Sequence, residues 1–280
     1  MIDLHVHSTA SDGEFAPADV VRHAATAGVT ILALTDHDTL SGVAAAVEAS
    51  AASGIRVIPG CEFSVDVPWG EMHLLGYFLN PDDERLASFL DAQRVGRLKR
   101  ATRIVDRLRK IGRTLTIDDV LAESHGDAVG RPHVARALKR RGHVGNIQDA
   151  FVRYIGYGRA AFVPKDLPSV EEVTSVIRAG GGVSSAAHLG VRATPAGLER
   201  LKFQGLDGVE VLHPAHDELT RRRIETMAVE LSLLKTGGSD WHGPMEEADR
   251  APLGSVGVPE EWVRILDEAH AARMTELEVG

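Results

Sequence analysis

Segments of strand length alternate with helical patterns along most of this 280-residue chain, and this order limits the fold more than any other feature. Such alternation predicts an α/β protein with a parallel sheet or a barrel. The predicted strands are residues 2–7, 30–35, 56–62, a stretch near 73–78, 183–187, 208–212 and 234–236. The predicted helices between and after them are residues 17–27, 40–53, 169–179, 195–203 and 217–231.

The alternation stops between residues 82 and 156, where mainly helical patterns follow one another. We therefore predict one α/β domain made of residues 1–81 and 157–280, with a helical insertion at 82–156 that caps the active site. The length allows one barrel-type domain or two ordinary ones, and a hydrophobic content of 44% allows a large core.

The first predicted strand carries Asp3, His5 and His7 between apolar residues. Because side chains alternate along a strand, these three polar residues share one face. Two imidazoles that point to one buried place indicate a metal ion better than they indicate two unrelated core histidines.

Further residues of the metal-binding types stand at the ends of later strands, where parallel β/α folds collect their active-site groups. The nine candidates are His5, His7, Asp12, His37, Glu62, His73, His188, Asp240 and His242. Nine ligands are too many for one tetrahedral ion, so two or three ions are expected. A mixed imidazole and carboxylate set favours Mn, Fe or Zn over Mg or Ca.

Taken in order, these motifs resemble the PHP (polymerase and histidinol phosphatase) family of metal-dependent phosphoesterases. The matching pieces are Asp3-Leu4-His5-Val6-His7-Ser8, Ser11-Asp12-Gly13, Leu34-Thr35-Asp36-His37-Asp38-Thr39, Gly60-Cys61-Glu62, Met72-His73-Leu74-Leu75-Gly76-Tyr77, Ala187-His188 and Gly238-Ser239-Asp240-Trp241-His242-Gly243. The resemblance implies a distorted (β/α)7 TIM-like barrel with a trinuclear site. It differs at Leu189, where the family pattern has proline after the histidine.

By position, the resemblance implies three sets of metal ligands. The first ion would be held by His5, His7, Glu62 and Asp240, the second by Glu62, His73 and His188, and the third by Asp12, His37 and His242. Asp240 is thus also a candidate catalytic residue. The expected chemistry is hydrolysis of a phosphate monoester by a metal-activated hydroxide.

Three further phrases resemble a branch of stand-alone nucleotide phosphoesterases. They are Gly130-Arg131-Pro132-His133-Val134-Ala135-Arg136-Ala137-Leu138, Phe162-Val163-Pro164-Lys165 and Leu212-His213-Pro214-Ala215-His216. The resemblance implies a substrate such as an AMP-like nucleotide, a nucleoside 3',5'-bisphosphate or the 5' end of a short RNA. The alternatives are a histidinol-phosphate phosphatase and a non-catalytic module that binds a nucleotide.

Several residues outside the metal set are candidates for contacts with the substrate. They are Arg131, His133, Lys165, Arg192, His213 and His216. Surface charge is an equally good explanation for each of the three cations. For His216, protonation of the leaving oxygen and capping of the next helix are both open. Asp3 and Asp36 either orient ligand imidazoles or make ordinary buried hydrogen bonds.

The formal net charge of −9 opposes binding to long duplex nucleic acid. The basic run from Arg94 to Arg113 has an approximate apolar stripe, so a solvated helix face explains it better than RNA binding. The single cysteine, Cys61, is expected in the core, and no disulfide within the chain is possible. No signal region or membrane-spanning run is found, so we expect a cytoplasmic protein without membrane contact; the oligomeric state is unknown.

Overall fold

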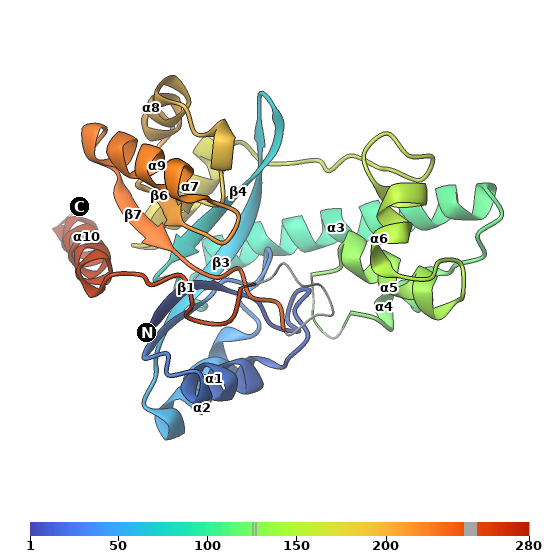
Figure 1. The fold of residues 1–280 in the computed structure, drawn as a ribbon, viewed down its shortest axis with the longest axis horizontal. Helices are drawn as coiled ribbons and strands as arrows, with labels where there is room; N and C mark the ends of the chain where they lie inside the picture. Colours follow the sequence, from blue (N-terminus) through green and yellow to red (C-terminus); the bar gives the residue numbers. More distant parts are fainter. Residues whose placement is uncertain (125, 127, 244–250, 280) are drawn as a thin grey trace.

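The computed structural model describes residues 1–124, 126, 128–243 and 251–279. Within them, every predicted strand is present, and the strands form one sheet in chain order (Figure 1). The strands are β1 (Ile2–Val6), β2 (Ile31–Leu34), β3 (Arg56–Val67), β4 (Gly70–Tyr77), β5 (Val183–Ala186), β6 (Gly208–Leu212) and β7 (Leu234–Gly237). The α/β prediction is therefore confirmed.

The sheet is not parallel throughout, which corrects the sequence-based expectation. β4 runs antiparallel to both β3 and β5, whereas the other neighbouring pairs are parallel. The reason is local: Val67 pairs with Gly70, so only Pro68 and Trp69 connect β3 to β4, and such a short connection reverses the chain. An isolated parallel bridge from Val6 to Trp241 links β1 to the segment after β7, so the two ends of the sheet approach each other as in a distorted barrel, without a ladder between the described strands β1 and β7.

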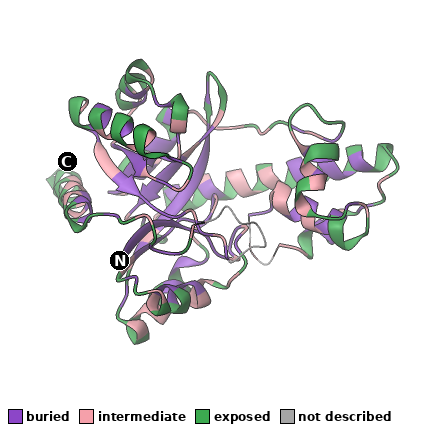
Figure 2. Ribbon diagram, viewed as in Figure 1, coloured by how far each residue is buried: buried purple, intermediate pink, exposed green. Residues whose placement is uncertain are grey.

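Helices surround the sheet, and the five predicted ones are all found. They are α1 (Pro17–Thr26), α2 (Val43–Ser53), α7 (Val170–Ala179), α8 (Pro195–Phe203) and α9 (Glu218–Glu230). α1 and α2 cover one side and α7 to α9 the other, so the strands between them are buried almost throughout (Figures 1 and 2). A short 3-10 helix (Gly190–Arg192) and α10 (Glu260–Val279) were not predicted; α10 buries Trp262, Val263 and Leu266.

Residues after β4 form a lateral helical layer with its own apolar core. Its elements are α3 (Glu84–Lys110), α4 (Ile117–Leu121), α5 (Arg131–Arg140), α6 (Ile147–Ala150) and a π-helical turn (Phe151–Ile155). Helix α3 joins the two bodies, because Leu90 packs in the barrel core and Leu108 in the second core (Figure 1). That second core extends to Ala161 and Val163, beyond the predicted boundary at residue 156.

Two smaller predictions can also be compared with the structure. Cys61 is fully buried on β3 within the barrel core, as expected for a small apolar residue. Among the helices that the structure describes, none combines the length and the apolar character needed to cross a membrane.

Candidate metal centre

The nine side chains predicted as metal ligands gather at one edge of the sheet. They come from β1 and its loop (His5, His7, Asp12), the end of β2 (His37), β3 (Glu62), β4 (His73) and the segments after β5 (His188) and β7 (Asp240, His242). Parallel strands present their carboxyl ends at this edge. Because β4 runs in the opposite direction, it brings His73 to the same edge from its amino-terminal half.

The Glu62 carboxylate lies at the middle of this cluster and is almost fully buried. Its Oε2 atom is 3.4 Å from His5 Nε2 and 3.2 Å from both His7 Nε2 and His37 Nδ1. Its Oε1 atom is 2.8 Å from His73 Nδ1 and 3.1 Å from His188 Nε2. One carboxylate therefore faces five imidazoles, as a group shared between two ions would.

Several sets of ligand atoms in the cluster are close enough to share an ion. They are His5/His7/Glu62/Asp240, His7/Asp12/His37/His242, His37/Glu62/His73 and His5/Glu210/His213. The first set is the one implied for the first ion, and the second contains the residues implied for the third. Around the implied second ion, the structure adds His37 beside Glu62 and His73. The assignment of each ligand to an ion stays a prediction.

Buried ring nitrogens without a hydrogen-bond partner support a cation site. Among the described residues, these nitrogens include His5 Nε2, both nitrogens of His7 and His37 Nδ1. A buried polar atom without a partner costs free energy unless something else binds it. All three residues belong to the sets above, so metal ions would satisfy these atoms.

Burial and the neighbouring charges shift the pKa values of the groups in the cluster in opposite directions. Burial lowers the pKa of His7, but the Asp240 and Glu62 carboxylates outweigh burial and raise it to about 10. Burial raises the pKa of Glu62, yet the surrounding imidazoles, His73 foremost, hold it well below its usual range. The carboxylate is therefore ionised at neutral pH, and the site attracts positive charge.

Glu210 is a functional residue that the sequence predictions missed. It is fully buried in β6, where its Oε1 accepts a hydrogen bond from His5 Nδ1 at 3.0 Å. Its Oε2 accepts the backbone N–H of His188 at 2.7 Å. The sequence contained a signal for this role, because a glutamate between two valines of a buried strand needs a partner. Glu210 thereby orients two predicted ligands at once.

Asp3 and Asp36 orient loops and not imidazole rings. Asp3 accepts the backbone N–H of Ser239 at 2.8 Å. Asp36 accepts the Ser8 backbone N–H at 2.8 Å and the Ser8 and Ser11 hydroxyls at 2.6 Å. Of the two interpretations, buried hydrogen bonding is the one that these contacts favour, and it holds the loops that carry the predicted ligands.

His216 differs from both of its sequence-based interpretations. Its Nδ1 donates to the carbonyl of Val211 at 2.9 Å, and its Nε2 accepts the N–H of Gly190 at 3.0 Å. Both nitrogens are thus used by the backbone, and none is left to protonate a leaving oxygen. The cap of α9 is Asp217, whose side chain accepts an N–H within the first turn. His216 joins the loops after β5 and β6.

His213 is better placed than His216 to contact a substrate. It lines a pocket together with Glu62, His73 and Asp240, and its Nε2 lies 3.6 Å from Asp240 Oδ2. Its Nδ1 accepts the N–H of Ala215 at 3.1 Å, so the neutral ring carries its proton on Nε2. That nitrogen can donate a hydrogen bond to an oxygen atom in the pocket.

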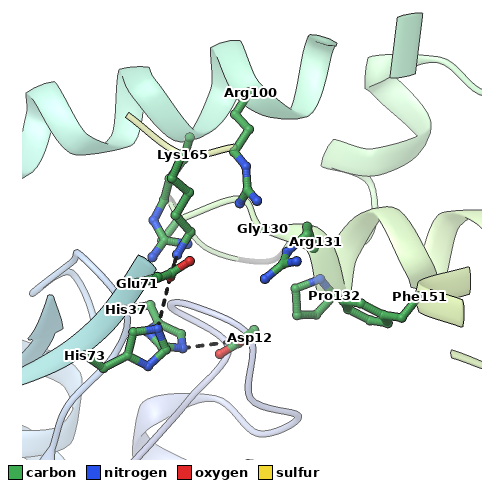
Figure 3. A pocket seen from close by; sticks show the side chains of 12 residues that line it. Asp12, His37, Glu71, His73, Arg100, Gly130, Arg131, Pro132, Phe151 and Lys165 are labelled. Atoms are coloured by element: carbon green, nitrogen blue, oxygen red, sulfur yellow. Dashed lines mark hydrogen bonds and ion pairs between the residues drawn. The ribbon is translucent and has the colours of Figure 1, made fainter. Parts of the chain in front are cut away.

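A second pocket, the cationic pocket, lies beside the cluster (Figure 3). Its four cations are Arg97, Arg100, Arg131 and Lys165, and its floor includes His37 and His73. Arg100 is only 8% exposed, and burial, followed by the charge of Arg131, lowers its pKa to about 10. The prediction of a solvated helix face is therefore wrong for Arg97 and Arg100. Arg97 and Arg100 point inward from α3, because the insertion lies over the barrel edge.

Two of these cations are held in place by acidic partners. Arg97 Nε donates to Asp38 Oδ2 at 2.6 Å. Lys165 Nζ donates to Ser64 Oγ at 2.8 Å and forms an ion pair with Glu71. Each pair fixes a long side chain beside the predicted ligands, while the net charge of the pocket stays positive. The pocket can therefore bind an anion.

The remaining predicted substrate contacts divide into two kinds. His133 is buried, and its Nδ1 accepts the N–H of Gly130 at the start of α5, so it shapes the pocket without lining it. Burial lowers its pKa to about 4. Arg192 lines a neighbouring pocket with Arg131, His73 and His188. Structure thus places Arg131, Lys165, Arg192 and His213, but not His133 or His216, where a substrate could touch them.

Comparison with known proteins agrees with this arrangement. The model of the PHP domain matches residues 3–148. The chain is 36% identical over 247 residues to a 5'-3' exoribonuclease from Haemophilus influenzae, covering 86% of this chain and 90% of the relative. It is 34% identical over 253 residues to a 3',5'-nucleoside bisphosphate phosphatase from Chromobacterium violaceum, covering 88% of each. A crystal structure from Bifidobacterium adolescentis, assigned to the metal-dependent phosphoesterases, matches with a TM-score of 0.87 and 33% identity over 96% of both chains.

Proposed function

The chain belongs to the PHP domain family and is a metal-dependent phosphoesterase, and on this premise we propose that its substrate is a nucleotide with a second phosphate group. The two substrates that fit are a nucleoside 3',5'-bisphosphate and the 5' end of a short RNA. The relatives named above support this proposal, because one is a bisphosphate phosphatase and the other acts from the 5' end of RNA.

The nine predicted ligands would hold two or three divalent ions, with Mn, Fe or Zn favoured by their donor atoms. Glu62 would be the shared ligand, and its five imidazole neighbours support that role. When bound, the ions supply Lewis acidity and a hydroxide nucleophile near neutral pH. His213 would donate a hydrogen bond from Nε2 to a phosphoryl or leaving oxygen.

The observation that carries the choice of substrate is the cationic pocket. Arg97, Arg100, Arg131 and Lys165 converge beside His37 and His73, at the rim of the metal cluster. One phosphate on the metal ions would leave a second one within reach of these cations. A single-phosphate substrate such as histidinol phosphate has no group for them. We further propose that the helical insertion acts as the cap of the site, because it supplies Arg97, Arg100 and Arg131.

A substrate panel tests the function. Purified, metal-loaded protein should release phosphate from adenosine 3',5'-bisphosphate or shorten 5'-phosphorylated RNA, with lower kcat/KM for AMP and lowest for histidinol phosphate. The same RNA with a 5'-hydroxyl is the control. Failure to hydrolyse any nucleotide would contradict the function, and a preference for histidinol phosphate would support that alternative instead.

Replacing Glu210 with glutamine should weaken metal binding by about 10- to 100-fold, because the amide cannot accept from both His5 Nδ1 and the His188 N–H. Titration of the metal-free protein with Mn²⁺ measures the affinity. Glu199→Gln, on the exposed surface of α8, is the matched control and should bind as the unmodified protein does. Equal affinity in the Glu210 variant would mean that the carboxylate does not orient the ligands.

The pKa of Lys165 predicts a pH effect. Burial, followed by the charge of Arg97, lowers this pKa to about 8, so the ammonium loses its charge in mildly alkaline solution. KM for adenosine 3',5'-bisphosphate should therefore rise between about pH 7 and pH 9 more steeply than KM for AMP. Lys165→Arg should remove this difference, because a guanidinium stays charged. Parallel profiles for both substrates would show that Lys165 does not bind the second phosphate.

We also propose that the protein is cytoplasmic. Its partner would be a small phosphorylated substrate, such as a nucleotide or a short oligonucleotide, and not long duplex nucleic acid. The formal net charge of −9 supports the choice of a small substrate, since it repels long duplex nucleic acid.

A further inference from the structure

The third pocket, which Arg192 lines, borders the metal cluster on the side of the β3–β4 hairpin and is called the hairpin pocket. Its lining includes Trp69, Met72, Leu189 and Arg192, and it shares Glu71, His73 and Arg131 with the cationic pocket. It has two cationic residues where the cationic pocket has four, although that pocket is also lined by Pro132 and Phe151. Three large apolar side chains stand here with two guanidinium groups, next to predicted ligands.

Trp69 is an unusual residue to find in such a place. It occupies the two-residue turn of the hairpin, and its side chain is 41% exposed although large aromatic residues are mostly buried. The backbone on both sides of the turn is held by the strand ladder, because β3 and β4 stay paired from Gly60 and Tyr77 up to Val67 and Gly70. A tryptophan side chain has only two torsions to order, so stacking on it costs little conformational entropy.

We propose that Trp69 forms the base-stacking wall of a nucleoside subsite in the hairpin pocket, an inference that rests on the proposed function. The base lies against the indole ring in the pocket that Arg192 also lines, while the scissile phosphate reaches the metal cluster beside His73. Trp69 precedes His73 by four positions along nearly extended chain, or roughly 13 Å, which is comparable with the length of a nucleotide. Stacking on an aromatic face accepts any base, so this subsite recognises nucleotides without sequence preference.

The two pockets that share His73 thus bind chemically different parts of the substrate. The cationic pocket holds the second phosphate, and the hairpin pocket holds a base. Arg131 belongs to both linings and stands where the sugar-phosphate backbone passes between them.

Among the residues that the structure describes, the exposed rings of Tyr157 and Phe203 do not meet these conditions. Tyr157 packs on Phe162, 5.4 Å between ring centroids, in the segment after the π-helical turn. Phe203 is 90% exposed at the end of α8, just before the start of β6 and so at the sheet edge opposite the cluster. Phe203→Ala is therefore a matched control for loss of an exposed aromatic ring.

The kinetic test compares a ligand with a base and one without it. Adenosine 3',5'-bisphosphate and 1,2-dideoxyribose 3,5-bisphosphate carry the same phosphates. Trp69→Ala should raise KM for the adenosine compound by roughly 10- to 100-fold, with kcat nearly unchanged. It should leave the kinetics of the abasic compound unchanged. Trp69→Phe should restore most of the affinity, and Phe203→Ala should change neither substrate. Equal effects of Trp69→Ala on both compounds, or none, would overturn the stacking role.

A binding measurement separates this proposal from the proposed function. Trp241 and Trp262 are buried, so a nucleotide that stacks on Trp69 should quench a fluorescence component that Trp69→Ala removes. Titration of metal-loaded protein with adenosine 3',5'-bisphosphate gives this signal whether or not phosphate is released. No quenching, or equal quenching in Trp69→Ala, would reject stacking even if the enzyme is active. Quenching that depends on Trp69 without turnover would support the subsite and reject the function.

Discussion

Glu62→Gln should reduce kcat by about 10³-fold or more and should lower the number of metal ions bound per chain. The carboxylate is buried and faces five imidazoles, so its charge is what a pair of neighbouring cations would share. Loss of groups that only orient a ligand already costs about 10- to 100-fold, and Glu62 lies closer to the centre than those. Elemental analysis of the purified protein and steady-state kinetics measure the two effects.

The control for this change is Glu48→Gln, which removes the same charge from an exposed position on α2. It should keep full activity and metal content. Circular dichroism should show that the Glu62 variant retains its secondary structure, since glutamine has nearly the same volume. A Glu62 variant with normal metal content and normal kcat would contradict the shared-ligand role.

Asp240→Asn should reduce kcat by about 10²- to 10³-fold while leaving the fold nearly unchanged. Asp240 Oδ1 lies 3.4 Å from His5 Nε2 and 3.2 Å from His7 Nε2, so the substitution removes a negative charge from the predicted first ion. The residue has a positive φ of 53°, a conformation that asparagine adopts more readily than most residues. Asparagine therefore keeps the backbone and the size and changes the charge alone.

Thermal unfolding and phosphate release, measured on the same preparation, distinguish a chemical defect from a folding defect. Asp267→Asn is a suitable control, because that aspartate pairs with Arg56 at the exposed side of α10. It should remain fully active. Activity that survives in Asp240→Asn would show that the ligand assignment is wrong.

The candidate ligands could be predicted because metal chemistry restricts residue type and parallel strands restrict position. His5 and His7 alternate on one strand, and Asp240 and His242 repeat that spacing at the other end of the barrel. Most of these residues were also expected at or just after a strand end, where parallel β/α folds collect their active-site groups. The structure brings all of them to one place, although their roles as ligands await measurement.

Groups that act through packing were harder to predict. Arg97 and Arg100 look in the sequence like members of a solvated basic face, and only the position of α3 over the barrel edge turns them inward. Glu210 gave a weaker signal than the histidines, because the sequence does not show which residue a single buried glutamate pairs with. His216 was misassigned because hydrogen bonds to Val211 and Gly190 come from backbone atoms, which have no sequence signature.

The order of strands and helices, the family and the nine metal-type side chains could all be read from local patterns, because side-chain periodicity and ligand chemistry depend on residue type. Tertiary contacts decided the direction of β4, the inward face of α3 and the separation of a cationic pocket from the hairpin pocket of Trp69. These features arise from how distant segments pack, and packing depends on the summed shape of both partners. The choice among phosphate substrates therefore depends on the tertiary structure, whereas the metal-dependent chemistry could be predicted from the residue types near the strand ends.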